Sequence, residues 1–377
     1  MNKIGREVLF LAADETATRN GEGSFIRLKD GGIMLTYTEF FGESHRDSGE
    51  ARFVATVSRD EGETWGEKRV IVTKAEYAMN IMSTSLVRMN NGDIGLLYLQ
   101  KYIKDRIVYD EILLRRSSDE GLTWSEPTVC NVRDSYYCPA NGRALRLKNG
   151  RIILAVAEYG RRLGEPGTGE TGTDNIYSPG SILCLFSDDD GITWQESQSK
   201  LPPLFQDDTH EGFSLTEPCL YERETGELYM YIRTDLRMQY ETVSTDGGNT
   251  WTSPRPNLLF ASGSSPMLVQ KFGAKTLAIW NPVPKPSPFM FAEYPIFDRS
   301  NRTPLLCAVS EDDGQTYGWA CFIEDDITNN FCYPAAIEAD GYLLVCYYHS
   351  NDSEYTLNSL KVTKIRYDEL ENPLASN

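Results

Sequence analysis

An eight-residue pattern that recurs five times constrains the fold of this 377-residue chain more than any other feature. It has Ser at the first position, Asp at the third, Gly at the fifth, Thr at the seventh and an aromatic residue at the eighth. The copies cover residues 58–65, 117–124, 187–194, 244–251 and 310–317, and only the last ends on Tyr instead of Trp. Ser and Asp can hydrogen-bond turn backbone, Gly supplies a positive φ, and the aromatic ring buries apolar area beneath the turn. We therefore predict five similar hairpins within one large closed domain.

The spacing of this pattern resembles the Asp box of the sialidase/neuraminidase superfamily. The resemblance implies an all-β fold, a six-bladed β-propeller, with the boxes on the outer rim between the third and fourth strands of a blade. In that family the boxes are structural, so residues that carry chemistry must be sought elsewhere on the fold.

A second repeat, in which a turn containing Gly separates two apolar strands, occurs six times and predicts six blades. The turns are Asp30-Gly31, Asn91-Gly92, Asn149-Gly150, Thr225-Gly226, Phe272-Gly273 and Asp340-Gly341. An Asp box follows each of the first five turns but not the sixth. We expect residues 7–12 to supply the strand that the last blade lacks, which would join the two ends of the chain and leave no open sheet edge. The prediction is one propeller domain over residues 1–377.

The charge of the chain limits its partners. It carries 55 acidic and 37 basic residues, a formal charge of −18. Such a field opposes binding to nucleic acid and to anionic membranes. An anionic substrate would have to be held by a local cluster of arginines inside this acidic shell.

The cysteine and apolar patterns add further expectations. The eight cysteines are scattered without a C-x-x-C pair and only three histidines are present, so we expect buried reduced thiols, no metal and no cofactor. No apolar stretch approaches the ~18 residues of a membrane span. The N-terminal apolar run, Val8–Ala13, is too short for a secretory signal, which favours a cytoplasmic protein.

Polar residues recur at a fixed distance before the Gly turns. In a propeller the first strand of each blade lines the central axis, and its start faces the cavity where ligands bind. Counting eight residues back from each turn gives Glu22, Ser83, Asn141 and Glu217 in blades one to four, and Cys332, next to Tyr333, in blade six. Blade five presents residues 264–266. Such residues are poor core formers, and we interpret them as a site; the alternative is a polar axis around ordered water.

The resemblance assigns the reaction to three residues. Tyr333 matches the nucleophile of the sialidases, and Glu217 matches the glutamate that deprotonates it. Attack on an anomeric carbon that bears a carboxylate favours a neutral nucleophile, which a tyrosine paired with a glutamate supplies. Asp47, eleven residues before the first box, matches the residue that protonates the leaving oxygen and later activates water, a role for which His45 competes.

Sialidases bind the substrate carboxylate with three arginines, and two of them are matched here. Arg233 follows Glu217 by sixteen residues, and Arg302 stands shortly before the fifth box. Both can bind a planar carboxylate through paired N–H donors.

The third arginine is absent from its expected place. Glu22-Gly23-Ser24-Phe25 stands where sialidases have an aromatic residue, arginine, isoleucine and proline, and His349 stands where they have the glutamate that supports this arginine. We interpret the paired change as a redesigned subsite in which Glu22 contacts a sugar hydroxyl or amine, or orients an arginine. Arg19 or Arg143 could restore the third charge.

Together these features predict an exo-acting, retaining glycosidase of the sialidase superfamily whose substrate is a carbohydrate with an acidic sugar. One alternative is a glycosidase that uses Glu22 and Glu217 as its carboxylate pair; a separation of roughly 5 Å would indicate a retaining pair and about 6.5 to 9.5 Å an inverting one. The other alternative is a glycan-binding propeller without catalysis.

Overall fold

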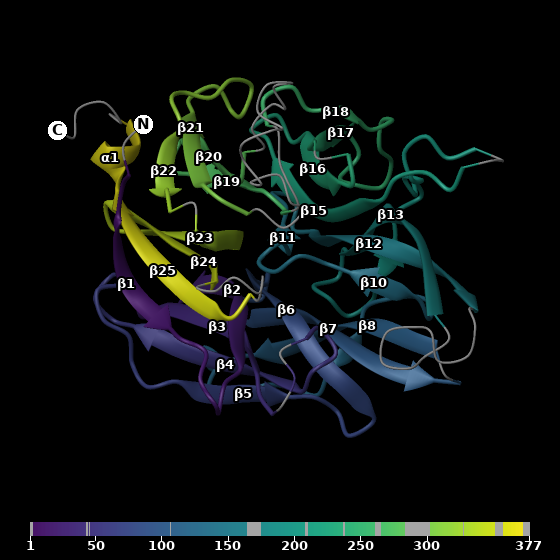
Figure 1. The fold of residues 1–377 in the computed structure, drawn as a ribbon, viewed down its shortest axis with the longest axis horizontal. Helices are drawn as coiled ribbons and strands as arrows, with labels where there is room; N and C mark the ends of the chain where they lie inside the picture. Colours follow the sequence, from purple (N-terminus) through teal and green to yellow (C-terminus); the bar gives the residue numbers. More distant parts are fainter. Residues whose placement is uncertain are drawn as a thin grey trace.

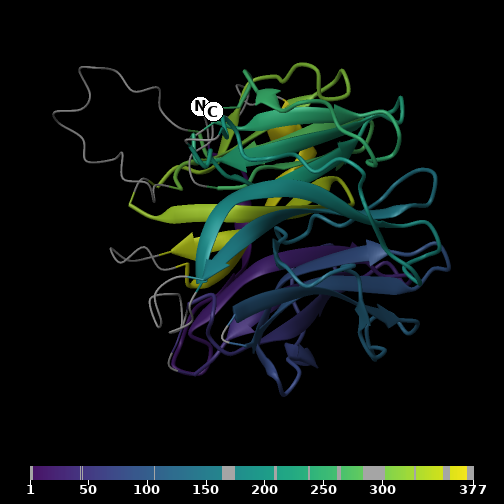
Figure 2. The ribbon, with the colours of Figure 1, turned by 90° about the vertical axis from the view of Figure 1, so that its right-hand side faces the viewer.

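The computed structural model describes residues 3–42, 44, 46–105, 107–163, 175–207, 210–236, 238–260, 265–282, 302–326, 328–350 and 357–371. Six antiparallel sheets surround a central axis as the blades of a β-propeller (Figure 1). Turned by 90°, the sheets lie stacked from the purple and blue ones to the green ones, with their strands running across the view (Figure 2). The predicted all-β, six-bladed fold is confirmed.

Each blade runs from an inner strand at the axis to an outer strand at the rim. Blade one contains β2 (Arg19–Arg27), β3 (Ile33–Phe40), β4 (Ala51–Ser58) and β5 (Arg69–Thr73). Blade two contains β6 (Ala78–Arg88), β7 (Ile94–Lys104), β8 (Ile107–Ser117) and β9 (Thr128–Val129). In blade three the inner strand is divided into β10 (Tyr136–Cys138) and β11 (Leu145–Arg146), followed by β12 (Ile152–Leu163), β13 (Asn175–Ser187) and β14 (Gln195–Glu196).

The second half of the ring repeats this order. Blade four contains β15 (Leu215–Glu222), β16 (Leu228–Thr234), β17 (Tyr240–Ser244) and β18 (Arg255–Pro256). Blade five contains β19 (Leu268–Phe272), β20 (Lys275–Trp280), β21 (Leu305–Ser310) and β22 (Cys321–Glu324). Blade six contains β23 (Asn330–Ala339), β24 (Tyr342–Ser350) and β25 (Ser359–Arg366), and the short helix α1 (Tyr367–Glu371) follows it.

The N-terminal strand completes blade six. β1 (Arg6–Leu11) pairs antiparallel with β25, and Figure 1 shows the purple strand beside the yellow one. The predicted closure therefore occurs, with the strand beginning and ending one residue earlier than expected. In the part of the chain that the structure describes, no helix is long and apolar enough to cross a membrane.

The Asp boxes are local hydrogen-bonded units. In the first box Ser58 Oγ donates to Asp60 Oδ1 at 2.8 Å and accepts from the Gly62 N–H, while Asp60 Oδ1 accepts from the Thr64 N–H at 2.8 Å. The other four boxes repeat the serine–aspartate and aspartate–threonine contacts. Every box connects the third strand of its blade to the fourth, as predicted. The terminal ring is buried only at Trp194; the other four are half-buried.

A ring of six hydrogen bonds, which we call the rim ring, joins neighbouring blades. In each bond, a backbone N–H near a Gly turn donates to an acidic side chain of the next blade. The pairs are Lys29 with Glu120, Asn90 with Asp190, Lys148 with Glu222, Glu224 with Asp313, Gly273 with Glu338 and Asp340 with Glu61, at 2.6–3.1 Å. Four of these acceptors, Glu61, Glu120, Asp190 and Asp313, are the fourth residue of an Asp box. The boxes therefore also fasten blades together.

Apolar side chains fill the space between neighbouring blades. The described residues form six buried clusters, one for each pair of adjacent sheets. Strands packed on both faces are buried throughout, as in β3, whose eight residues are all buried. This packing fixes the inner strands, and thus the direction of the side chains at their axial ends.

Candidate active site

Five blades place a residue with a positive φ at the axial end. Glu22, Ser83, Gly142, Glu217 and Tyr333 have φ values between 46° and 63°. In blades one, two, four and six the residue lies in a β-bulge, where pairing with the second strand changes register. This conformation costs a non-glycine residue about 1–3 kcal/mol and is concentrated at functional sites. The predicted offset identifies these positions in blades one, two and four; in blades three and six the residue is one further along.

Tyr333 and Glu217 meet from blades six and four. The Tyr333 hydroxyl donates to Glu217 Oε1 at 2.5 Å, and Arg233 Nη1 donates to Glu217 Oε2 at 2.5 Å. Glu217 is 7% exposed, while Tyr333 and Arg233 are half-buried, so the carboxylate lies beneath its two partners. Burial raises the pKa of the Tyr333 phenol well above its usual value, and the Glu217 carboxylate acts in the same direction. The phenol is therefore protonated at neutral pH, and Glu217 is placed to accept its proton.

Arg302 lies beside the same phenol. Its Cζ is 5.2 Å from the centroid of the Tyr333 ring, and its Nη1 donates to Cys332 Sγ at 3.2 Å. The backbone of Arg302 is fixed by blade six, because its N–H donates to Asn330 Oδ1 and its carbonyl accepts from the Phe331 N–H. The structure therefore brings Glu217, Arg233, Arg302 and Tyr333 together, as the sequence predicts.

Arg19 supplies a third arginine to the axial site. Its Nη1 donates to Asp47 Oδ1 at 2.6 Å, its Nη2 to Glu22 Oε1 at 3.2 Å and its Nε to the Tyr348 hydroxyl at 2.9 Å. The Tyr348 ring lies where a Cβ on residue 21 would be, at 1.7 Å from its Cε1, so this arrangement requires Gly21. Of the two candidates for the third charge, Arg19 is the one that contacts the proposed acid.

Asp47 is held at the edge of the site. Asn80 Nδ2 donates to its backbone carbonyl at 2.5 Å, and its side chain is 54% exposed. Desolvation opposes ionisation, but the charges of Arg19 and Lys101 outweigh it and lower the pKa of Asp47 to about 2. Without a ligand, Asp47 is thus a carboxylate bound to Arg19 and has no proton to donate. His45, its competitor for the acid role, lies outside the described residues.

Glu22 is a buried carboxylate, 3% exposed. Oε2 accepts hydrogen bonds from the Ser83 N–H at 2.8 Å and the Ser83 hydroxyl at 3.3 Å, and Oε1 contacts Arg19. Burial raises the pKa of Glu22, while the positive charge of Arg19 opposes the rise. Glu22 therefore orients Arg19 and ties blade one to blade two.

His349 lies apart from this cluster. Its ring contacts Phe10 and Phe331, each at a centroid distance of 5.3 Å, and its Nδ1 has no hydrogen-bond partner among the described residues. Side chains alternate along β24, so the neighbouring residue, Tyr348, is the one that reaches Arg19. The contact with Arg19 that was expected at position 349 is thus made by Tyr348, one position earlier.

Asn141 and Arg143 approach the axis from blade three. Asn141 Nδ2 donates to the carbonyls of Gly23 at 2.7 Å and Tyr333 at 3.3 Å. The Arg143 guanidinium donates to the carbonyls of Asn141, Pro334 and Met267 at 2.9, 2.9 and 3.2 Å. Both side chains thus bind main chain of other blades.

Lys101 belongs to the site but was not predicted. It is 6% exposed on β7, and its Nζ donates to the Tyr136 hydroxyl at 3.2 Å. Burial opposes its charge, yet Tyr136, Asp110 and Asp47 raise the pKa of Lys101 well above its usual value. The available signal was a lysine two residues after the largely apolar run Ile94–Leu99, within the strand that this run begins.

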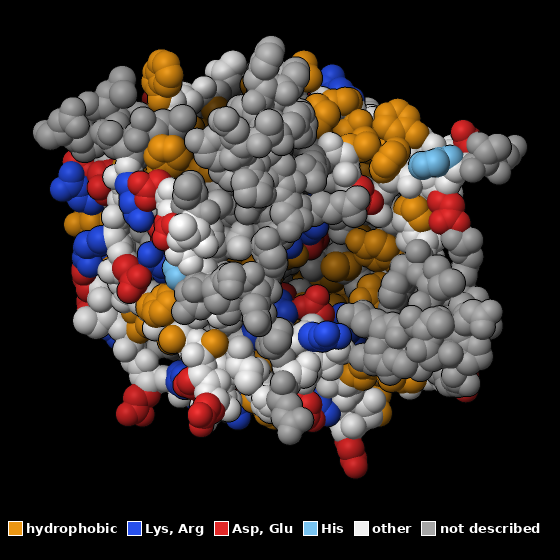
Figure 3. Space-filling view, viewed as in Figure 1, with side chains coloured by type: hydrophobic (Ala, Val, Ile, Leu, Met, Phe, Trp, Pro, Cys, Tyr) orange, Lys and Arg blue, Asp and Glu red, His pale blue; other side chains and the backbone are white. Residues whose placement is uncertain are grey.

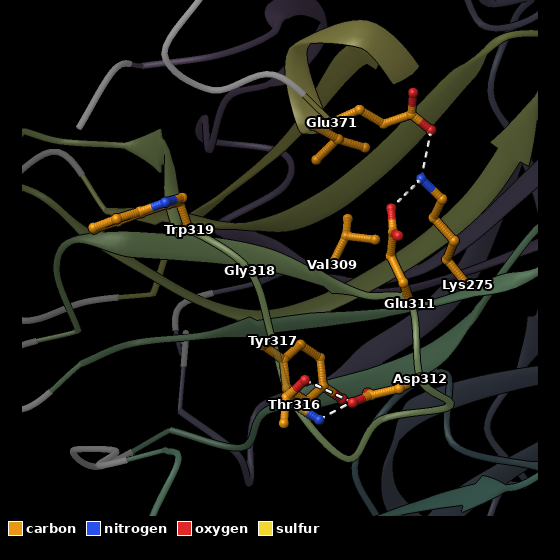
Figure 4. A pocket seen from close by; sticks show the side chains of 10 residues that line it. Lys275, Val309, Glu311, Asp312, Thr316, Tyr317, Gly318, Trp319 and Glu371 are labelled. Atoms are coloured by element: carbon orange, nitrogen blue, oxygen red, sulfur yellow. Dashed lines mark hydrogen bonds and ion pairs between the residues drawn. The ribbon is translucent and has the colours of Figure 1, made fainter.

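Side chains of opposite charge meet at the centre of the propeller face. Figure 3 shows acidic and basic side chains adjoining at a hollow there, with hydrophobic side chains on the side of blade three. A separate cavity of about 410 Å³ lies at the rim of blade five (Figure 4). Lys275 binds Glu311 and Glu371 on one side of it and Trp319 forms the other. It contains none of the predicted site residues.

Comparison with known proteins adds the following matches. The model of the BNR repeat-like domain family matches residues 31–345. Anhydrosialidase of Macrobdella decora is 24% identical over 190 residues, which are 49% of this chain and 22% of that protein. The chain thus spans about a fifth of the length of this curated relative.

Solved structures share the fold at low sequence identity. A protein of unknown function from Dyadobacter fermentans superposes with a TM-score of 0.69 at 19% identity, over 96% of this chain and 99% of that one. The NanB sialidase of Streptococcus pneumoniae gives 0.70 at 14% identity, over 97% and 71%. A leech intramolecular trans-sialidase gives 0.70 at 13% identity, over 99% and 72%.

Proposed function

Because the chain belongs to the BNR repeat-like domain family and has a sialidase-like propeller, we propose that it is an exo-acting, retaining glycosidase that acts on sialic acid or a related acidic sugar. One observation carries the proposal: the Tyr333 hydroxyl, the Glu217 carboxylate and the Arg233 guanidinium are in direct contact at the axis.

The proposed reaction begins at the phenol. As Tyr333 Oη bonds to the anomeric carbon, its proton passes to Glu217 and the bond to the leaving oxygen breaks. Asp47 gives that oxygen its proton, and then accepts a proton from the water that attacks the same carbon. The bond to Tyr333 Oη breaks as water attacks, and the phenolate takes its proton back from Glu217. Two displacements at one carbon retain its configuration.

Three arginines from different blades form the proposed carboxylate clamp. Arg302 lies against Tyr333, Arg233 binds Glu217, and Arg19 is oriented by Tyr348 and Glu22. Positive charge from several directions suits a planar anion and overcomes the acidic surface locally. Lys101 adds a fourth cation beside Asp47, suited to an acceptor group elsewhere on the sugar.

Binding of a substrate carboxylate to Arg19 is expected to free Asp47 from its ion pair, so that Asp47 can take up a proton. A ligand anion at Arg19 would replace Asp47 there, so the pKa of Asp47 rises from about 2 and the complex takes up a proton. Calorimetric titration with free sialic acid between about pH 4 and 5, in buffers of different ionisation enthalpy, measures this uptake. Asp47→Asn should bind without it. Binding to the parent protein without proton uptake would contradict this role of Arg19.

Glu22→Gln is expected to raise KM by about tenfold, because a hydrogen bond to a charged group contributes about 1.5–3 kcal/mol and the amide holds Arg19 less firmly. Steady-state kinetics on the best substrate measures the change. Glu324→Gln is the control. Glu324 lies on blade five, is 2% exposed and forms ion pairs with Lys3 and Lys361. An unchanged KM for Glu22→Gln would show that Glu22 does not support the clamp.

The contacts of the two carboxylates favour the tyrosine route over the carboxylate pair. Glu22 uses one oxygen for Arg19 and the other for Ser83, while Glu217 uses its two oxygens for Tyr333 and Arg233. Glu22 is thus occupied as a support, and Glu217 touches the candidate nucleophile.

A screen of the purified protein against aryl glycosides of acidic and neutral sugars tests the proposal. Release of the aryl group from an acidic sugar with retained configuration is the expected result. Cleavage of neutral glycosides alone would overturn the substrate class. Saturable glycan binding with no cleavage of any glycoside would identify the non-catalytic propeller instead.

A further inference from the structure

We propose that Asn141 and Arg143 are positioning residues that hold the main chain of Tyr333 and Pro334 from blade three and thereby set the phenol against Glu217. This inference rests on the proposed function, because it concerns the nucleophile named there.

The bulge in β23 makes such support necessary. Cys332 pairs with Tyr348 and Ala335 pairs with Cys346, so Tyr333 and Pro334 have no paired residue on β24. Asn141 Nδ2 donates to the Tyr333 carbonyl at 3.3 Å, and Arg143 Nη1 donates to the Pro334 carbonyl at 2.9 Å. A left-handed residue persists only where its surroundings hold it. The two side chains replace the support that β24 does not give.

The interrupted inner strand of blade three allows its loop to approach β23 closely. This strand is interrupted between β10 and β11, and Gly142 lies in the gap with a φ of 63°. A Cβ on Gly142 would be 3.0 Å from Ala335 Cβ, so the glycine allows the loop to approach β23 closely. Asn141 is fully buried and Arg143 is 4% exposed, which leaves neither side chain room to move.

The charge of Arg143 also acts on the proton transfer between Tyr333 and Glu217. Among the described residues no carboxylate lies within 4.0 Å of its guanidinium, which donates to the carbonyls of Asn141, Pro334 and Met267. Burial lowers the pKa of Arg143, while Cys219 and the Glu217 carboxylate act in the opposite direction. A fixed cation behind the bulge favours negative charge on Glu217 and on the phenol as the proton moves. With three carbonyls to bind, Arg143 is poorly placed to bind a substrate carboxylate as well.

Arg143→Lys keeps the charge but cannot bind three carbonyls in the same plane. On the best aryl glycoside, kcat is expected to fall about 10- to 100-fold, because a shift of the Tyr333 hydroxyl by about 1 Å would misplace the nucleophile. KM should stay within about threefold of the parent value. Arg146→Lys, on the exposed side of β11, is the matched control and should change neither constant. A rise in KM with kcat unchanged would place Arg143 in substrate binding and overturn the proposal, as would unchanged kinetics in a folded variant.

A crystal structure of Arg143→Lys gives a readout that does not depend on activity. The separation of Tyr333 Oη from Glu217 Oε1 should increase beyond hydrogen-bond distance. If the parent protein cleaves no glycoside, that failure counts against the proposed function alone, and an unchanged Tyr333–Glu217 contact in the variant would separately overturn the positioning role. If Arg143→Lys does not fold, Asn141→Ser, which loses the bond to the Tyr333 carbonyl, should show the same direction of change.

Discussion

Tyr333→Phe is expected to lower kcat by several orders of magnitude while leaving the fold and ligand binding intact. The change removes only the hydroxyl that donates to Glu217 at 2.5 Å, so the covalent route is lost while the clamp and the acid remain. Steady-state and single-turnover kinetics measure the loss of kcat. Calorimetric titration with free sialic acid measures whether the arginine clamp keeps its affinity for the ligand.

The matched control is Tyr77→Phe. The Tyr77 hydroxyl also donates to a carboxylate, Glu111, at 3.0 Å, but on the exposed face of blade two. This variant should keep full activity. If Tyr333→Phe retains turnover within about tenfold of the parent protein, the tyrosine is not the nucleophile, and the Glu22/Glu217 pair becomes the better mechanism.

Trp194→Ala is expected to lower the free energy of unfolding by about 3–5 kcal/mol, the usual loss for truncation of a buried aromatic residue. Trp194 is 9% exposed, packs in the cluster between blades two and three, and donates from Nε1 to the Gly191 carbonyl at 3.2 Å. Denaturant-induced unfolding measures the loss. Activity per folded molecule should be unchanged, because the box is on the rim.

Trp319→Ala provides the comparison for this variant. Trp319 is 75% exposed beside the cavity of Figure 4, so its removal should change the free energy of unfolding by no more than about 0.5 kcal/mol. A Trp194→Ala protein as stable as its parent but without turnover would show that the box has a catalytic role.

The sequence was sufficient for the fold because each repeat carries its own turn chemistry. The serine, aspartate and glycine of every box make the expected local contacts, and these depend on spacing within eight residues. The closing strand was also predictable from the missing sixth box. The rim ring was not, because its bonds join turns and boxes that lie far apart in the sequence.

The candidate site was predicted less completely, because the distance from the Gly turn to the left-handed axial residue varies by one. A count of eight residues found Glu22, Ser83 and Glu217, but in blades three and six the left-handed residue lies one position nearer the turn. There the count gave Asn141, next to Gly142, and Cys332, next to Tyr333. A shift by one residue moves a side chain to the other face of a strand, so this difference matters for the site.

The same one-residue uncertainty affected the third arginine. The position expected to support it falls on His349, whereas Tyr348 makes the contact with Arg19. Arg19 itself could be proposed only as one of two candidates, since its ion pair with Asp47 joins β2 to a loop beyond β3. Lys101 gave only a weak signal, because a lysine after an apolar strand is usually exposed.

The rim ring also determines how the propeller should respond to acid. The pKa values of Glu61 and Glu120 are lowered chiefly by hydrogen bonds from Arg27 and Arg88, that of Glu120 to about 2. A carboxylate with a lowered pKa stabilises the folded state above its unfolded pKa, and this contribution disappears as the pH falls toward the folded value. Glu61 joins blade six to blade one, and Glu120 joins blade one to blade two. As the pH falls toward the folded pKa values of these two carboxylates, protonation therefore weakens the closed circle on both sides of blade one. Acid should therefore loosen the propeller first where its N-terminal blade meets its two neighbours.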